Sequence, residues 1–152
     1  MTSSEEDLEE KNKQVAHQFY DAFNRHDPEG MSHLVSSNAS YTFHFAGMPA
    51  TDWKARKQFV TNVVKAFPDI DHHILDIVAE GDKVALRFNI TGTHKGQFQD
   101  IPATGKKISV GCMNFLTIID GKIIEEWSNS DMMGLMQQIG AIPVLSNAVD
   151  TG

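Results

Sequence analysis

The dipeptide Asp120-Gly121 separates two segments of β-type sequence and constrains the fold more than any other feature of the chain. An Asp-Gly pair between alternating apolar segments is typical of a two-residue hairpin turn, because both turn positions need a positive φ. The flanking segments, residues 108–119 and 122–130, are therefore predicted to pair as antiparallel strands. Gly81-Asp82 predicts a second hairpin, between residues 72–79 and 84–93.

The N-terminal half of the chain has helical periodicity instead. Apolar residues at three- and four-residue spacing predict a first helix over residues 4–24 and a third over residues 53–67. Between them, Asp27 is placed to cap a short helix, and residues 41–45 alternate like a strand. A last short helix is expected over residues 132–139. Helices followed by an antiparallel meander predict the α+β class, with a curved mixed or antiparallel sheet covered by the N-terminal helices.

Composition limits the class of protein. A chain of 152 residues with 41% hydrophobic residues fits one folded domain over residues 1–152. The net charge of −7 argues against nucleic acid as a partner. The sequence has no apolar run of the length that crosses a membrane, and its acidic start does not resemble a secretory signal. With one cysteine, Cys112, the expected location is the cytoplasm.

Counting outwards from the Asp120-Gly121 turn gives a register for the longer hairpin. Asn114 then pairs with Trp127, and Cys112 pairs with Asn129. Residues that lie opposite one another share a face, and Asp131 is expected at the end of this one. The face is mostly apolar with polar groups at one end, a composition that suits the wall of a small-molecule pocket.

The same counting applies to the Gly81-Asp82 hairpin. It places His73 opposite Ile90, on an apolar face that continues to His94. On the other face Asp76 pairs with Arg87, which predicts an exposed cross-strand ion pair.

Two polar residues are the candidate catalytic groups. Asp131 precedes the last predicted helix, so it is interpreted either as a helix N-cap or as a general acid/base. His94 is interpreted as a hydrogen-bond donor to a substrate carbonyl, as a partner for Asp131, or as a surface histidine at a strand end. The candidate substrate-binding residues, each with a structural interpretation as core or surface, are Trp127, Asn114, Asn129, His73, His44 and Phe45. No histidine pair or CxxC motif has metal-ligand spacing, so no metal site is predicted.

Several short motifs occur in one order along the chain. They are Ala66-Phe67-Pro68-Asp69, residues 80–85, 92–96, 101–106 and 120–127, Asp131, and residues 137–140. Together they resemble the SnoaL-like polyketide cyclases of the nuclear transport factor 2-like superfamily, over residues 13–140. The resemblance implies a cone-shaped, cystatin-like α+β barrel with residues 13–140 as its core and flexible ends. It also implies a homo-oligomer, no metal or organic cofactor, and an acid/base aspartate that corresponds to Asp131.

The leading hypothesis is a cofactor-independent acid/base enzyme that acts on a small hydrophobic carbonyl compound, with intramolecular aldol cyclisation of a polyketide ester as the reaction that the resemblance implies. Characterised cyclases carry a histidine on the preceding strand where this chain has Asn114. The alternatives are a non-catalytic binding protein, another cofactor-free isomerase or hydratase, and a dimeric scaffold.

We also expect a homodimer, formed through the outer face of the long hairpin. The predicted register assigns nine residues to this face: Ser109, Gly111, Met113, Phe115, Thr117, Ile119, Ile124, Glu126 and Ser128.

Overall fold

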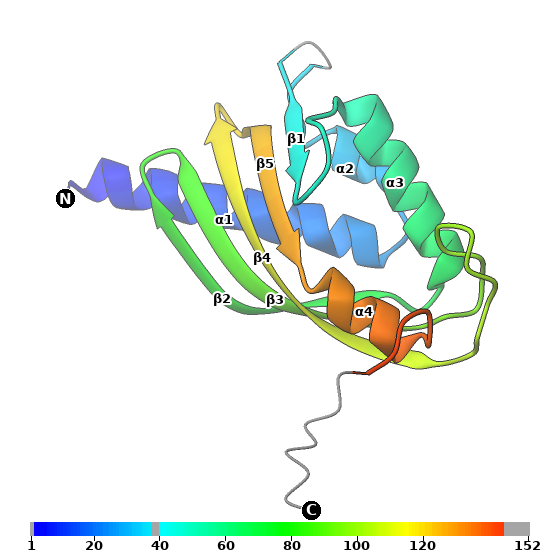
Figure 1. The fold of residues 1–152 in the computed structure, drawn as a ribbon. Coiled ribbons are helices and arrows are strands. Elements are labelled where there is room, and N and C mark those ends of the chain that lie inside the picture. The colour runs from blue at the N-terminus through cyan, green and yellow to red at the C-terminus, as the bar shows by residue number, and fades with distance from the viewer. Residues whose placement is uncertain (1, 38–39, 145–152) are drawn as a thin grey trace, which may run out of the picture.

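The computed structural model describes residues 2–37 and 40–144, which form four helices and five strands (Figure 1). The helices are α1 (Ser3–Asn24), α2 (Pro28–Ser32), α3 (Trp53–Ala66) and α4 (Met132–Gln138). The strands are β1 (Thr42–Phe45), β2 (Asp71–Glu80), β3 (Lys83–Thr93), β4 (Lys107–Ile119) and β5 (Lys122–Ser130). Each element predicted from periodicity and turn signals is confirmed, with ends that differ by at most one residue.

Side-chain caps set where the helices begin. Asp27 accepts a hydrogen bond from the backbone N–H of Gly30, and Asp52 accepts one from that of Ala55, both at 2.9 Å. These contacts satisfy N–H groups that the first turn of a helix leaves without partners. The cap predicted for α2 at Asp27 is therefore confirmed, and Asp52 caps α3 in the same way.

The five strands form one sheet in the order β1-β5-β4-β3-β2. β1 runs parallel to β5, and all other neighbours are antiparallel, so the sheet is mixed. In Figure 1 the sheet curves strongly, α1 lies along one of its faces, and α2 and α3 lie beside β1. We call the face that packs against α1 and α3 the inner face, and the opposite one the outer face.

The β4–β5 hairpin departs from the predicted register. The first two pairs, Ile119–Lys122 and Ile118–Ile123, are as predicted, but the next pair is Thr117–Glu125. Ile124 is therefore an extra residue in β5, and such a bulge reverses the face of every side chain beyond it. Asn114 pairs with Ser128 and Cys112 with Ser130. The predicted pairing of Asn114 with Trp127 and of Cys112 with Asn129 is wrong: Trp127 and Asn129 lie on the outer face, whereas Glu126 and Ser128 lie on the inner face.

A second irregularity changes the β2–β3 hairpin. The pairs nearest the turn follow the prediction, and Asp76 forms its predicted ion pair with Arg87 at 2.6 Å. Beyond them the register shifts between Ile74 and Asp76, so His72 rather than His73 pairs with Ile90. The predicted inward position of His73 is wrong, because the extra residue turns its side chain to the outer face.

The hydrophobic core fills the space between the inner face and the helices. Phe19, Tyr20 and Phe23 of α1 are buried there, together with Val60 of α3 and Phe88 of β3. On the outer face of β4, Met113 and Phe115 remain exposed. Within residues 2–37 and 40–144, no helix combines the length and the hydrophobicity needed to cross a bilayer.

Candidate functional site

A cavity of about 80 Å³ lies between the inner face and helices α1, α3 and α4. Its wall is largely aromatic and includes Phe23, Phe43, Phe45, Phe59, Phe67 and Phe88. Polar side chains reach it at only a few points, chiefly Tyr20, Arg56, His72, Asn114, Ser128 and Ser130. An apolar enclosure with a few placed polar groups is the usual form of a small-molecule site.

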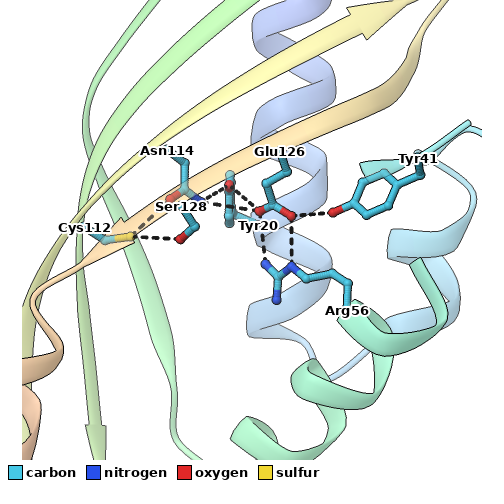
Figure 2. A network of polar contacts seen from close by, with 7 residues as sticks. All are labelled: Tyr20, Tyr41, Arg56, Cys112, Asn114, Glu126 and Ser128. Atoms are coloured by element: carbon cyan, nitrogen blue, oxygen red, sulfur yellow. Dashed lines mark hydrogen bonds and ion pairs between the residues drawn. The ribbon is translucent and has the colours of Figure 1, made fainter. Parts of the chain in front are cut away.

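A hydrogen-bonded network centred on Glu126 lies beside this cavity (Figure 2). Glu126 is 0% exposed and accepts hydrogen bonds from Nε and Nη2 of Arg56 at 2.9 and 3.1 Å. It also accepts from the hydroxyl groups of Tyr41 at 2.6 Å and Tyr20 at 3.3 Å, and from Nδ2 of Asn114 at 3.4 Å. The network joins β5, β4, α1, α3 and the segment before β1, so it fixes the relative positions of the elements around the cavity.

Electrostatics fix the protonation states of Arg56, Tyr20 and Tyr41. Burial lowers the pKa of Arg56, but the charge and hydrogen bonds of Glu126 outweigh burial and raise it above its ordinary value. Burial, followed by the charge of Glu126, raises the pKa of both Tyr20 and Tyr41 well above the usual range. Arg56 is therefore a permanent cation, and the two tyrosines remain neutral donors at physiological pH.

Small polar groups of β4 and β5 continue the network along the wall. The Sγ atom of Cys112 lies 3.1 Å from Oγ of Ser130 and 3.3 Å from Oδ1 of Asn114. Burial raises the pKa of the Cys112 thiol, so it stays protonated and behaves as a small core side chain.

His72 presents a hydrogen-bond acceptor to the cavity. Its Nδ1 lies 2.9 Å from Oδ1 of Asn24, and an amide oxygen can only accept, so Nδ1 carries the proton. The ring packs 4.3 Å from that of Phe23. Burial, followed by the charge of Arg56, lowers the pKa of His72 to about 3. The imidazole is therefore neutral, with a lone pair on Nε2.

Asp131 caps α4 and does not line the cavity. Its Oδ1 accepts a hydrogen bond from the backbone N–H of Gly134 at 2.8 Å, and its carboxylate is exposed. A Cβ atom at Gly134 would lie 2.3 Å from the other carboxylate oxygen, so the glycine permits this geometry. Asp131 lines a groove on the outer side of the sheet with Met113 and Asn129. The capping interpretation is confirmed, while the acid/base role stays a prediction.

His94 is fully buried, and the ring of Phe67 lies between it and the cavity. Its Nδ1 accepts from the backbone N–H of Thr104 at 3.3 Å and lies 3.0 Å from the hydroxyl of the same residue. Its ring stacks on Phe67 at 5.4 Å between centroids, and Phe67 lines the cavity. The surface interpretation of His94 is wrong because the loop at Thr104 covers it. Its role as a donor to substrate stays a prediction.

The other predicted substrate-binding residues divide between the two faces. Phe45 and Asn114 line the cavity. Trp127 is 51% exposed on the outer face, where its ring stacks on His44 at 3.8 Å and 6°. Asn129 and His73 are also exposed on that side. The structure therefore does not bring the predicted site residues together around one pocket.

Sequence reasoning missed the residues that supply the polar groups of the inner face: Tyr20, Tyr41, Arg56, His72 and Glu126. Arg56 had a detectable signal, since it lies three residues before Phe59 and seven before Val63, on the apolar stripe of α3. A charged residue on an apolar stripe needs a buried partner. The sequence does not show which of Glu125 and Glu126 faces inward as the partner of Arg56, because that depends on the bulge at Ile124.

The cavity offers donors and acceptors suited to an organic molecule. Across residues 2–37 and 40–144, no group of three or more His, Cys, Asp or Glu side chains is arranged to hold a metal ion. The polar atoms at the wall are a guanidinium, an imidazole nitrogen, an amide and hydroxyl groups. Such groups orient an oxygen-bearing ligand by hydrogen bonds.

Solved structures of bacterial proteins share this architecture. AclR from Streptomyces galilaeus, described as a candidate hydroxylase, is 28% identical with a TM-score of 0.82, over 91% of this chain and 86% of AclR. IdmH from Streptomyces antibioticus, a candidate polyketide cyclase, is 28% identical with a TM-score of 0.75, over 85% of this chain and 98% of IdmH. TsrD from Streptomyces laurentii is 26% identical with a TM-score of 0.77, over 87% of this chain and 96% of TsrD.

Sequence comparison agrees with the structural one. No curated protein matches the sequence significantly. The sequence model of the family described as SnoaL-like polyketide cyclase matches residues 13–139, which is most of the chain. This range is nearly the same as residues 13–140, over which the sequence motifs resemble that family. Because motifs, fold and family model coincide over that span, the chain belongs to the SnoaL-like polyketide cyclase family.

Proposed function

We propose that the protein is a cofactor-independent acid/base enzyme that encloses a small hydrophobic carbonyl compound in the inner-face cavity. The observation that carries the proposal is the cavity itself, whose aromatic wall is interrupted by a few oriented polar groups. Membership of the SnoaL-like family supports carbonyl chemistry. The two solved relatives named as a hydroxylase and a polyketide cyclase are of the same fold, so the fold alone does not select the reaction.

The proposed reaction is an intramolecular aldol cyclisation. A base removes a proton from a carbon next to a carbonyl, and the C–H electron pair becomes an enolate. The enolate carbon bonds to a second carbonyl carbon of the same molecule. The resulting alkoxide takes a proton from the conjugate acid of the base, so substrate and product are isomers. The cavity wall would contribute by folding the chain so that the two carbons meet.

Two side chains are candidates for the base. Asp131 is the residue that the family resemblance favours, with His94 as its partner or as a donor to the substrate. To reach a ligand in the cavity, Asp131 would have to leave the cap that it forms with Gly134. His72 already lines the cavity with a lone pair on Nε2, although its pKa of about 3 makes it a weak base. Weakness alone does not exclude His72, because the aspartate base of ketosteroid isomerase deprotonates a carbon acid with an only modestly raised pKa.

Exchange of α-protons tests the proposal and assigns the base. 1-Phenylpropan-2-one in D2O, followed by proton NMR, should lose its α-protons faster with the protein than in buffer, with saturation. Asp131→Asn should abolish this acceleration if Asp131 is the base, and His72→Phe should abolish it if His72 is. Trp127→Phe, on the outer face, is the matched control and should leave the rate unchanged. Binding of the ketone without any acceleration would reject the enzyme.

A non-catalytic binding protein is the second candidate. Glu126 is the one buried carboxylate among the described residues, and Arg56, Tyr41, Tyr20 and Asn114 all donate to it. The carboxylate oxygens of Glu126 are directed at these side chains, and Glu126 is not among the residues that line the cavity, so it has no contact with a ligand there. This favours ligand binding without turnover, and the exchange experiment separates the two functions.

We also propose a homodimer through the outer face. Apolar side chains are exposed there on three of the five strands, namely Leu75, Val78, Met113, Phe115 and Trp127. An apolar patch of this kind suggests a partner, and a second copy would match it about a two-fold axis. The bulge corrects the predicted composition of this surface, which includes Trp127 and excludes Glu126 and Ser128. We propose the cytoplasm as the location, because the single cysteine of the chain, Cys112, is a free thiol.

A further inference from the structure

Arg56 holds one hydrogen-bond donor that the protein does not use. The side chain is 4% exposed, and its Nε and Nη2 atoms are bound to Glu126. The remaining nitrogen, Nη1, is buried and has no hydrogen-bond partner in the described part of the chain. Figure 2 shows one guanidinium nitrogen directed away from Glu126. Buried polar groups are nearly always paired, so this donor needs an explanation.

Aromatic rings surround the free end of the guanidinium. Its central carbon lies 4.6 Å from the ring centre of Phe43, 5.6 Å from that of Phe23 and 5.7 Å from that of Phe59. Arg56 and all three rings line the cavity. The rings attract the cation through their faces but offer no lone pair to an N–H group. The missing acceptor must therefore come from whatever occupies the cavity.

The charge of Arg56 is already balanced. Glu126 pairs with it in a two-point geometry, and Tyr41 and Tyr20 donate to the same carboxylate without adding charge. An anionic ligand at Nη1 would lose its hydration and would also be repelled by Glu126 in a medium of low dielectric constant. A neutral carbonyl oxygen accepts a hydrogen bond without this repulsion.

We propose that Nη1 of Arg56 binds an uncharged carbonyl oxygen of the ligand, and that Glu126 makes the site select ketones and esters over carboxylates. This inference rests on the proposed function, because it takes the cavity to be the ligand site. It adds to that function the group that binds the carbonyl oxygen. In the aldol reaction the same donor would stabilise the charge that develops on the oxygen as the enolate forms.

Three single-ring probes of similar shape test the selection: acetophenone, ethylbenzene and benzoate. Binding to the full chain is measured by calorimetric titration or ligand-observed NMR. In the wild-type protein acetophenone should bind at least about tenfold more tightly than either of the others, because only it satisfies Nη1 without adding charge. Equal binding of acetophenone and ethylbenzene would overturn the inference and leave the cavity as the binding site. Failure of all three to bind would overturn the proposed function as well.

Two variants isolate the groups responsible. Arg56→Met combined with Glu126→Gln removes both charges together, so no buried charge is left without a partner. This double variant should bind acetophenone and ethylbenzene within about threefold of each other. Glu126→Gln alone leaves the cation unbalanced and should gain about tenfold or more in affinity for benzoate. If the single variant does not fold, the double variant decides, and retained preference for acetophenone in it would refute the role of Arg56.

Discussion

Arg56 and Glu126 form a buried ion pair with two hydrogen bonds, at 2.9 and 3.1 Å, between α3 and the inner face of β5. Tyr41 and Tyr20 occupy further lone pairs of the carboxylate. Two charges that are fully removed from water cost several kcal/mol each in desolvation, and their mutual attraction offsets this only when both are present. The free energy of unfolding should therefore depend on whether one charge of the pair is removed or both.

Loss of one member should be much more damaging than loss of both. Arg56→Met alone should lower the free energy of unfolding by about 3–5 kcal/mol, because Glu126 remains buried without its counter-ion. Arg56→Met with Glu126→Gln should lie within about 1–2 kcal/mol of the wild type, since the new amide oxygen can accept from the hydroxyl of Tyr41 and the new amide nitrogen can donate to the hydroxyl of Tyr20. Urea denaturation followed by circular dichroism measures both. A double variant as unstable as the single one would contradict the account.

His72 should make stability depend on pH in the mildly acidic range. Its pKa in the folded protein is about 3, against about 6.5 in an unfolded chain. Between these values the unfolded chain binds the extra proton, so the free energy of unfolding falls as pH decreases, by about 1.4 kcal/mol for each pH unit. This contribution is complete above about pH 6.5 and is lost progressively down to about pH 3.

Histidine variants separate this effect from the titration of carboxylates. His72→Phe keeps a ring against Phe23 and should flatten the pH dependence of the free energy of unfolding between about pH 6 and pH 4. His73→Phe changes the exposed neighbour and should leave that dependence as in the wild type. The comparison requires unfolding curves at several pH values, and a steep slope retained in His72→Phe would count against a buried neutral imidazole.

The cap at Asp131 predicts a graded effect on stability. Asp131→Ala removes the acceptor for the N–H of Gly134 and should lower the free energy of unfolding by about 1 kcal/mol. Asp131→Asn keeps a capping oxygen and should cost only a few tenths of a kcal/mol. Thermal melts of the two variants give this ranking independently of any activity. Identical melting temperatures for wild type and Asp131→Ala would show that the cap contributes nothing.

Phe115 tests the proposed dimer. Its side chain is 46% exposed on the outer-face patch, beside Met113 on β4 and paired with Trp127 on β5. Phe115→Glu should give monomers by light scattering at micromolar concentration, while cavity ligands bind as before, because the substitution faces away from the inner face. A wild type that is already monomeric would refute the dimer.

Local signals in the sequence were sufficient for the elements and their ends. The Asp120-Gly121 turn has the two positive φ angles that such a hairpin needs, 51° and 75°, and Asp76 and Arg87 pair as the turn count requires. The candidate site was less predictable, because it depends on which face each strand residue takes. The bulges at Ile124 and Leu75 change that face, and they depend on curvature of the folded sheet rather than on the identity of either residue. Trp127 and His73 were misplaced for this reason.

The extra residue Ile124 also determines which side chains of β5 face inward and which face outward. With the extra residue in place, Glu126 and Ser128 lie on the inner face while Trp127 and Asn129 face outward. A deletion of Ile124 would shift this frame by one and bring Glu125, Trp127 and Asn129 inward, without replacing any side chain beyond it. In this chain a change of one residue in the length of the hairpin would thus exchange all the polar side chains that β5 presents to the inner face, with no substitution among them.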